Sequence, residues 1–203
     1  MIVSHRHRFI FLKTRKTAGT SIEIHLSQLC DEGDIVTPFG VPEPGHLPRN
    51  AEGYYNHMPS AEIRERVGRR IWNSYFKFCF ERNPWDKVVS QYFFTRGRHG
   101  LEGLAFDDFV RSGELPVDSP AYRLEGEVCM DRIGQYADLL ADLGRICGAI
   151  GIPAPEELPR AKGGYRSGGP DFASLYDEPQ RARVAQAFAW EIRQFGYRFD
   201  PPR

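Results

Sequence analysis

Two short apolar runs, each followed by the signals of a helix start, constrain most strongly what this chain can fold into. The runs are "RFIFLK", Arg8 to Lys13, and "YFKFCF", Tyr75 to Phe80. Both are rich in residues that favour β structure, and unbroken apolar runs of this length are typical of strands buried on both faces of a parallel sheet. We therefore expect two central strands here.

Helical patterns follow both runs. Ile22, Leu26 and Leu29 recur at the spacing of one helix face, which predicts an amphipathic helix after Gly19. The second run leads into "RNPWDKVVSQYFF", which carries the chemistry of a helix start. Its Asn can cap a helix, its Pro suits the first helical position, and its Asp complements the positive end of the helix dipole.

The remaining chain continues this alternation. Helices are predicted over residues 60–68, 139–150 and 184–195, with Ser60 as the cap and Gly68 as the stop of the first. A third strand is predicted within residues 131–139. Because strands and helices alternate, we expect an α/β layer fold with a mostly parallel sheet.

Composition limits the number of domains and the partners. The chain has 203 residues, of which 41% are apolar, and this is enough for one sizeable core and too little to require two. Residues 1–203 are therefore expected to form a single domain. Lys and Arg number 27, as do Asp and Glu, so the formal net charge is zero. A neutral chain has no general attraction to nucleic acid or anionic membranes, so any anion site must be local.

The cysteines indicate a reducing environment. The four of them, Cys30, Cys79, Cys129 and Cys147, form no CxxC pair, and each lies in an apolar context that suits a small buried thiol. No apolar stretch is long enough to span a membrane, and the first residues do not have the pattern of a signal peptide. A cytoplasmic protein without a membrane span is expected.

The stretch "KTRKTAGTS", Lys13 to Ser21, joins the first predicted strand to its helix. Such a loop gathers unpaired backbone N–H groups at the positive end of a helix dipole and binds phosphate or sulfate readily. Gly19 allows close approach of the backbone, and Lys16 can reach a transferred group. This is not the GxxxxGK[ST] loop of NTPases, because Lys16 precedes Gly19. The alternative is a solvated basic turn with a helix cap at Thr20 or Ser21.

A second motif adds to this signal. "KTAGTS" and "ERNPWDKVVSQYF", in this order, closely resemble the two cofactor signatures of the sulfotransferase superfamily, and most nearly those of bacterial members of its family-2, carbohydrate-sulfotransferase-like type. The resemblance implies a three-layer fold like that of P-loop kinases, with a mostly parallel central sheet flanked by helices. It also implies transfer of the sulfuryl group of 3'-phosphoadenosine 5'-phosphosulfate (PAPS), which leaves adenosine 3',5'-bisphosphate (PAP). The resemblance implies that the reaction does not require a metal ion.

The resemblance assigns roles residue by residue. The 5'-phosphosulfate would be held by the loop residues Lys16, Thr17, Ala18, Gly19, Thr20 and Ser21, and the 3'-phosphate by Arg82 and Ser90. The sequence departs from the commonest family form at "LKTRK", where many relatives have His-Ile-Pro-Lys, and at Glu81, where an apolar residue is usual. Neither departure removes a residue assigned to the cofactor.

Arg82 and Ser90 also suit this role on physical grounds. Arg82 stands at the end of the second predicted strand and Ser90 one to two turns into the next helix, so both can line one opening beside the carboxyl edge of the sheet. The planar guanidinium suits bidentate recognition of phosphate. The alternative is that Arg82 pairs with Glu81 or Asp86 on the surface and that Ser90 is an ordinary helix residue.

Transfer to a hydroxyl needs a cation at the leaving oxygen and a general base. Lys16 is chosen for the first role. For the second we choose His57 in "YYNHMPSAEIR", because it lies between the two motifs and relatives carry a similarly placed His. His46 is the second choice, and Glu23 and Glu127 are weaker candidates. The alternative for His57 is a helix-flanking residue hydrogen-bonded to backbone.

The basic, glycine-rich stretch from Leu158 to Pro170 contains Lys162 and Arg166. We interpret it as a loop that closes over the 3'-phosphate and excludes water. The alternative is a solvated disordered loop.

The sequence therefore favours a PAPS-dependent sulfotransferase whose partners are a sulfonucleotide donor and a hydroxyl-bearing acceptor, a carbohydrate or a small metabolite among the options. Two other classes stay open: a non-catalytic sulfonucleotide-binding relative, and a small-molecule kinase of similar fold. The position of Lys16 counts against the kinase, since the Walker lysine is missing.

Overall fold

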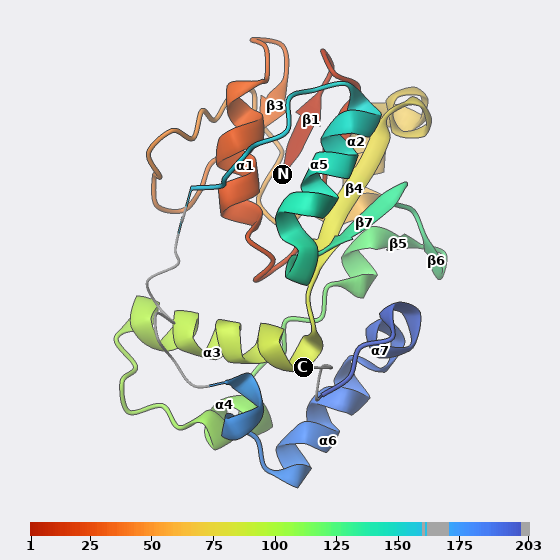
Figure 1. Ribbon diagram of the computed structural model, residues 1–203. Helices are drawn as coiled ribbons and strands as arrows, with labels where there is room; N and C mark the ends of the chain where they lie inside the picture. The colour runs from red at the N-terminus through yellow and green to blue at the C-terminus, as the bar shows by residue number, and fades with distance from the viewer. Residues whose placement is uncertain (160, 162–170, 200–203) are drawn as a thin grey trace. The chain divides into compact units, whose positions relative to one another are not determined.

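The structure is a computed structural model that describes residues 1–159, 161 and 171–199 (Figure 1). The chain forms two compact units. Unit 1 comprises Met1–Glu81 and Pro120–Ala161, and unit 2 comprises Arg82–Ser119 and Lys162–Arg203. The strands belong to unit 1, whereas the described part of unit 2 is built from helices.

Unit 1 contains a five-stranded sheet with the order β3-β1-β2-β4-β7. Its strands are β1 (Ile2–Ser4), β2 (Phe9–Phe11), β3 (Ile35–Val36), β4 (Phe76–Glu81) and β7 (Arg132–Gln135). β1 pairs antiparallel with both β2 and β3, whereas the pairs β2–β4 and β4–β7 are parallel. Because β1 alone is reversed within this sheet, the other strands run in one direction. The expected mostly parallel sheet is confirmed, and its two central strands come from the two apolar runs.

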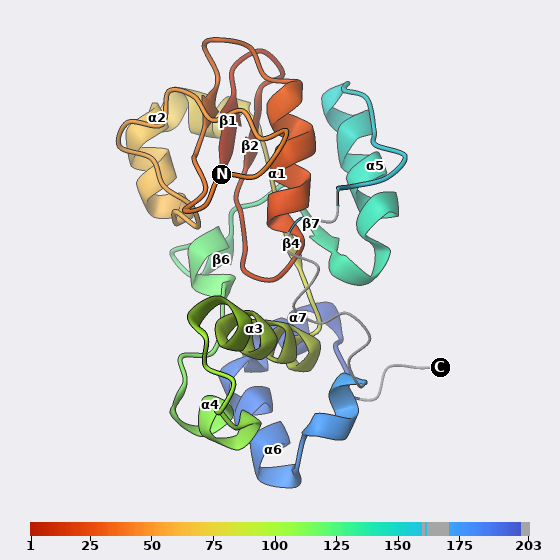
Figure 2. The same cartoon turned by 90° about the vertical axis from the view of Figure 1, so that its left-hand side faces the viewer.

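Helices cover both faces of this sheet. Figure 2 shows α2 (Ser60–Ser74) on one side of the strands, and α1 (Gly19–Gln28) and α5 (Leu139–Ile150) on the other. Successive side chains of a strand point to opposite faces. One face of β2 and β4 therefore packs as a single cluster against α1 and α5, with the members Phe9, Phe11, Phe78, Phe80, Ile22, Leu26, Leu143 and Ile146. The helix-flanked α/β architecture predicted from the sequence is confirmed.

Two strands of the sheet were not predicted. β1 lies in the charged amino-terminal stretch, and β3 lies in the segment of residues 31–55, which is rich in Pro and Gly. Both are too short for an alternating pattern to be read from sequence. They exist because β1 pairs with β2 and β3 with β1. A small hairpin of β5 (Arg123–Leu124) and β6 (Glu127–Val128) forms a separate two-stranded sheet.

Two predicted helices have different extents from those expected. α2 continues to Ser74, but Gly68 interrupts it with φ 81° and ψ 155°, so the predicted stop is a kink. The cap position of α2 is Pro59 and makes no side-chain cap hydrogen bond, so Ser60 is not the cap. The last predicted helix is divided into α6 (Glu178–Ala187) and α7 (Ala189–Phe195), with a non-helical residue between them at Phe188.

Unit 2 is a helical cluster. It contains α3 (Pro84–His99), α4 (Phe106–Ser112), the 3₁₀ turn η4 (Phe172–Leu175), α6 and α7. The predicted start of α3 is confirmed, because the Asn83 side chain accepts a hydrogen bond from the Trp85 N–H at 3.2 Å and Pro84 follows the cap. Inside the unit, the ammonium of Lys87 lies 2.8 Å from the carboxylate of Asp118, and both side chains are buried.

Within the described residues, no helix is long and apolar enough to cross a membrane. The four cysteines are free thiols. Burial, as the main cause, raises the pKa of Cys30 to about 12 and that of Cys147 to about 11, so these thiols stay protonated and unreactive at neutral pH. Cys129 is only half-buried, which departs from the expected full burial.

Gly134 should be intolerant of any side chain. It lies opposite Phe80 in the β4–β7 register, and a Cβ at Gly134 would stand 2.4 Å from Phe80 Cε1. Phe80 is fully buried, so its ring cannot move aside freely. Gly134→Ala is expected to lower the free energy of unfolding by about 1–3 kcal/mol through overpacking, as measured by urea denaturation. Gly148→Ala is the control, because nothing lies within 4 Å of a Cβ there; an equal loss in both variants would contradict this account.

Candidate functional site

The predicted anion-binding loop connects β2 to α1 in unit 1. The Leu12 N–H donates to the Phe78 carbonyl at 2.9 Å, which extends the parallel ladder by one residue before the chain turns. α1 then begins at Gly19, and its cap position is Ala18, with left-handed backbone and no side-chain cap hydrogen bond. The alternative of a helix cap at Thr20 or Ser21 is therefore wrong.

The backbone of this loop has the shape of an anion cradle. Lys16 has φ 60° and Ala18 has φ 61°, in the left-handed region that non-glycine residues seldom adopt. Left-handed residues near a helix start turn backbone N–H groups into a concavity that favours anions. Such strained residues cost about 1–3 kcal/mol each and persist where the surrounding structure holds them. The geometry thus supports phosphate or sulfate binding here.

Two threonines brace the loop from inside. The Thr17 hydroxyl donates to the Thr14 carbonyl at 3.2 Å and lies 2.9 Å from the Thr14 hydroxyl. The Thr14 hydroxyl in turn donates to the carbonyl of Phe80 in β4. The Thr17 side chain is buried and engaged within the loop, so the group it can offer an anion is its backbone N–H.

The basic side chains of the loop differ in their burial. Lys13 is buried, and its ammonium lies 2.5 Å from Glu23 Oε2 in α1. Arg15 and Lys16 are half-buried instead. Because the charge of Lys13 is neutralised inside the protein, the loop cations that can face an anion are Arg15 and Lys16.

Glu23 lies at the centre of a buried charge cluster. Its carboxylate accepts hydrogen bonds from Lys13, from the amino group of Met1 and from the Thr37 hydroxyl. Burial by itself would raise the pKa of Glu23, but the two positive charges and their hydrogen bonds outweigh it and lower the pKa below its ordinary 4.5. A fully buried, stably ionised carboxylate cannot reach an acceptor, so Glu23 is wrong as a candidate base.

His57 lies beside the loop. Its Nδ1 is 2.9 Å from the carbonyl oxygen of Lys13. A carbonyl only accepts, so Nδ1 carries the proton and the lone pair of the neutral ring is on Nε2. His57 has φ 61° and an exposed side chain. The alternative of a helix-flanking histidine bonded to backbone predicts the same contact, but here the backbone is that of the anion loop.

His46, the second choice for the base, lies in a different setting. Its ring stacks on Phe39 with a centroid separation of 3.7 Å and an interplanar angle of 12°. Phe39 is itself covered by the Lys13 ammonium, which lies 4.0 Å from the ring centroid. Stacking fixes the ring of His46, and the contact between Lys13 and Phe39 connects the Pro- and Gly-rich segment to the loop.

In unit 2, Arg82, Asp86 and Ser90 follow one another at four-residue spacing. Asp86 and Ser90 therefore share a face of α3. Arg82 Nε donates to Asp86 Oδ2 at 2.7 Å, and both side chains are largely shielded from solvent. The pair weighed as an alternative thus exists, but it is not a surface pair. It engages Nε and orients the guanidinium, whose two terminal nitrogens form the fork suited to phosphate.

The other predicted residues are placed as follows. Thr20 is half-buried and Ser21 buried in the first turn of α1. Lys162 and Arg166 lie outside the described residues. In the described part of the chain, no group of three or more His, Cys, Asp or Glu side chains could hold a metal ion.

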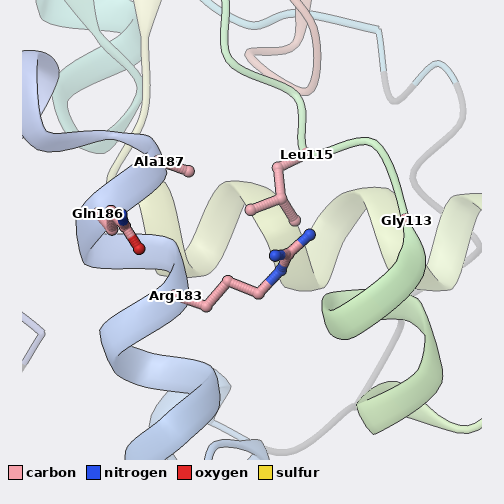
Figure 3. A pocket seen from close by; sticks show the side chains of 5 residues that line it. All are labelled: Gly113, Leu115, Arg183, Gln186 and Ala187. Carbon is pink, nitrogen blue, oxygen red and sulfur yellow. The ribbon is translucent and has the colours of Figure 1, made fainter.

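Unit 2 also has an open depression of about 440 Å³. It is lined by Gly113, Leu115, Arg183, Gln186 and Ala187, and Figure 3 shows the Arg183 side chain extending between Leu115 and Gly113. The Arg183 Nε donates to the Val110 carbonyl, which gives this side chain a structural role. Of the predicted site residues that the structure describes, none lines this depression.

Sequence reasoning missed the roles of Lys13 and Thr14. Neither residue was given a role of its own in the analysis of the sequence. No local pattern distinguishes a lysine that points into the protein from one that points out. The nearest signal is Glu23, a carboxylate in an otherwise apolar helix face.

Comparison with known proteins decides the family. The model of the sulfotransferase family matches residues 1–112, which is more than half of the chain and includes the loop, His57, Arg82 and Ser90. The chain belongs to the sulfotransferase family. A protein from Archaeoglobus fulgidus that is described as uncharacterized is 39% identical over 106 residues, which cover 50% of this chain and 87% of that protein.

The fold of this sulfotransferase-family protein is similar to that of a solved structure. The crystal structure of mouse sulfotransferase SULT7A1 complexed with PAP matches with a TM-score of 0.55 over 94% of this chain and 86% of that one. The sequences are 14% identical, so the match shows the fold. The sulfotransferase assignment made from the two motifs is confirmed, as is the α/β fold expected with it.

The buried carboxylate generates a pH-dependent prediction. Because the pKa of Glu23 is lowered in the fold, the stability that it contributes is complete above about pH 4.5 and is lost as the pH falls through the folded-state value. Glu23→Gln is expected to reduce the free energy of unfolding at pH 7, and the difference from wild type should shrink on acidification below pH 4.5. Urea denaturation over a pH series measures this.

The control for this series is Asp31→Asn, which breaks an exposed ion pair with Arg6 and should change stability little at any pH. A Glu23→Gln deficit that stays constant down to acid pH would contradict the ionised, paired state of Glu23.

Proposed function

We propose that this member of the sulfotransferase family transfers the sulfuryl group of PAPS to a hydroxyl or amine of an acceptor. The observation that carries the proposal is the strained loop between β2 and α1, with Lys16 on it and His57 hydrogen-bonded to it. An anion cradle, a cation and a base candidate on one short stretch of structure are what this chemistry requires. A carbohydrate or a small metabolite is the acceptor class that we infer.

The loop residues would hold the 5'-phosphosulfate. The backbone N–H groups from Thr17 to Ser21 lie at the amino end of α1, where the helix dipole favours an anion. Bound PAPS supplies an activated sulfuryl group whose bond to the bridging phosphate oxygen breaks during transfer. Lys16 would stabilise the negative charge that develops on that leaving oxygen, more in the transition state than in the ground state.

Arg82 and Ser90 would hold the 3'-phosphate. Asp86 holds Arg82 through Nε, and the planar guanidinium of Arg82 is a group suited to recognition of phosphate. Ser90 would add a hydroxyl from the same face of α3. In this proposal residues 1–203 act as one sulfotransferase domain, with Lys162 and Arg166 as further contacts of the nucleotide.

His57 would accept the proton of the acceptor. The Lys13 carbonyl holds the ring as the Nδ1–H tautomer, so Nε2 is the atom that takes the proton as the new oxygen–sulfur bond forms. We also infer a cytoplasmic location, because the four cysteines are free thiols, as is usual in a reducing compartment.

The first test uses PAPS labelled with ³⁵S and a mixed pool of hydroxyl and amine acceptors. Wild type is expected to move label to an acceptor, and Lys16→Ala to reduce the rate by a factor of about 10² or more. PAP affinity, measured by calorimetry, should fall only partly because the backbone N–H groups remain. Arg6→Ala, which removes an exposed cation elsewhere in unit 1, is the control.

The result discriminates between the candidate functions. Phosphoryl transfer from Mg-ATP with no transfer from PAPS would identify a kinase, and PAP binding without transfer would identify a binding protein. Wild-type turnover in Lys16→Ala would remove Lys16 from its role.

His57 generates a separate prediction. His57→Ala should lower kcat by a factor of about 10²–10⁴ while PAP affinity stays unchanged, because the base acts on the acceptor and not on the nucleotide. His46→Ala is the matched control; loss of turnover in that variant and not in His57→Ala would assign the base to His46.

A further inference from the structure

The side chain of Lys13 lies beneath the first turn of α1. Its ammonium is 2.5 Å from Glu23 Oε2 and 4.0 Å from the centroid of Phe39, and 6% of the side chain is exposed. An ammonium enclosed in this way cannot reach a bound nucleotide. Lys13 therefore needs an explanation other than anion binding.

The stem of Lys13 fills the space beside Gly19. A Cβ at Gly19 would lie 2.7 Å from Cγ of Lys13, 3.2 Å from Cε and 3.4 Å from Cδ. Gly19 is not among the glycines with positive φ, so its backbone conformation is open to any residue. The lack of a side chain at Gly19 is thus required by the Lys13 stem and not by the conformation of the chain.

The backbone of Lys13 touches the candidate base. Its carbonyl accepts from His57 Nδ1 at 2.9 Å. One residue therefore contacts the start of α1 through its stem, Glu23 through its ammonium, and His57 through its carbonyl. Lys16 and Ala18, the two left-handed residues that shape the cradle, lie between Lys13 and Gly19 in the chain.

We propose that Lys13 is a positioning residue, clamped between Gly19 and Glu23, that sets both the anion cradle and the tautomer of His57. The roles of the cradle and of His57 rest on the proposed function. The clamp acts because strained backbone persists only where neighbouring contacts over-determine it. Moving the Lys13 stem would displace the cradle and the carbonyl that faces His57.

A double-mutant cycle of Gly19→Ala and Lys13→Ala tests this. Gly19→Ala alone is expected to weaken PAP binding by about tenfold or more, and by less than about threefold when Lys13 is already Ala, because the contact that it violates is then gone. If glycine is needed instead for approach of the ligand, the loss is equal in both backgrounds, and the proposal is overturned. Gly148→Ala, in α5 of the same unit, is the control and should leave PAP affinity unchanged.

The ring nitrogens of His57 give a readout that does not depend on activity. In ¹⁵N NMR, wild type should show the Nδ1–H tautomer, Gly19→Ala a mixture of tautomers, and the double variant a return towards the wild-type pattern. An unchanged tautomer in Gly19→Ala would overturn the link between the clamp and His57.

The same variants also distinguish effects on folding from effects on PAP binding. If Gly19→Ala does not fold but the double variant does, the clamp is supported. If neither folds, Glu23→Gln is added to both, because Lys13→Ala leaves the buried Glu23 carboxylate unpaired. The clamp is then overturned if Gly19→Ala lowers Tm equally with Lys13 and with Ala at position 13. If wild type binds no PAP, the proposed function fails while the clamp is still tested, by comparing the fall in Tm caused by Gly19→Ala in the two backgrounds.

Discussion

The buried ion pair between Lys13 and Glu23 is the interaction on which the loop between β2 and α1 depends. A loop with two left-handed non-glycine residues is not stable on its own, because each such residue costs free energy that neighbouring contacts must offset. Glu23 is a buried residue of α1, and its ion pair with Lys13 links α1 to the residues that follow β2. Breaking one side of such a pair leaves a buried charge without compensation, which is why the two partners hold each other in place.

Burial and pairing with carboxylates also determine which cations of the protein can bind an anionic ligand. The chain is neutral overall, and several of its positive charges are held inside the units by carboxylates, as Lys13 is by Glu23 and Lys87 by Asp118. A neutralised, buried ammonium stabilises packing but offers nothing to an anionic ligand. Lys16 is a loop cation that stays half-exposed, beside a row of backbone N–H groups. The electrostatic attraction that the chain can offer an anion is therefore local.

Hydrogen bonds to backbone carbonyls give the candidate site its chemistry. The Lys13 carbonyl determines which nitrogen of His57 carries the proton, and the Phe80 carbonyl receives the Thr14 hydroxyl at the end of β4. Both carbonyls lie where the parallel strands of unit 1 end, which is where open α/β sheets place their ligands. Membership of the sulfotransferase family does not depend on this geometry, and both support the proposal that the loop binds an anionic donor.

The sequence by itself determined the two central strands, the helices that follow them, the start of α3 and the family. These features are encoded locally, by unbroken apolar runs, by the helix-start chemistry of Asn83 and Pro84, and by two short motifs. Only the tertiary structure decided that β1 and β3 exist, because strands of two or three residues are stabilised by pairing and carry no pattern of their own. It also decided that Lys13 points inward and that His57 bonds to the Lys13 carbonyl. The direction of a side chain depends on partners elsewhere in the sequence. The partner of the Lys13 ammonium is Glu23, and the partner of the His57 ring is the Lys13 carbonyl.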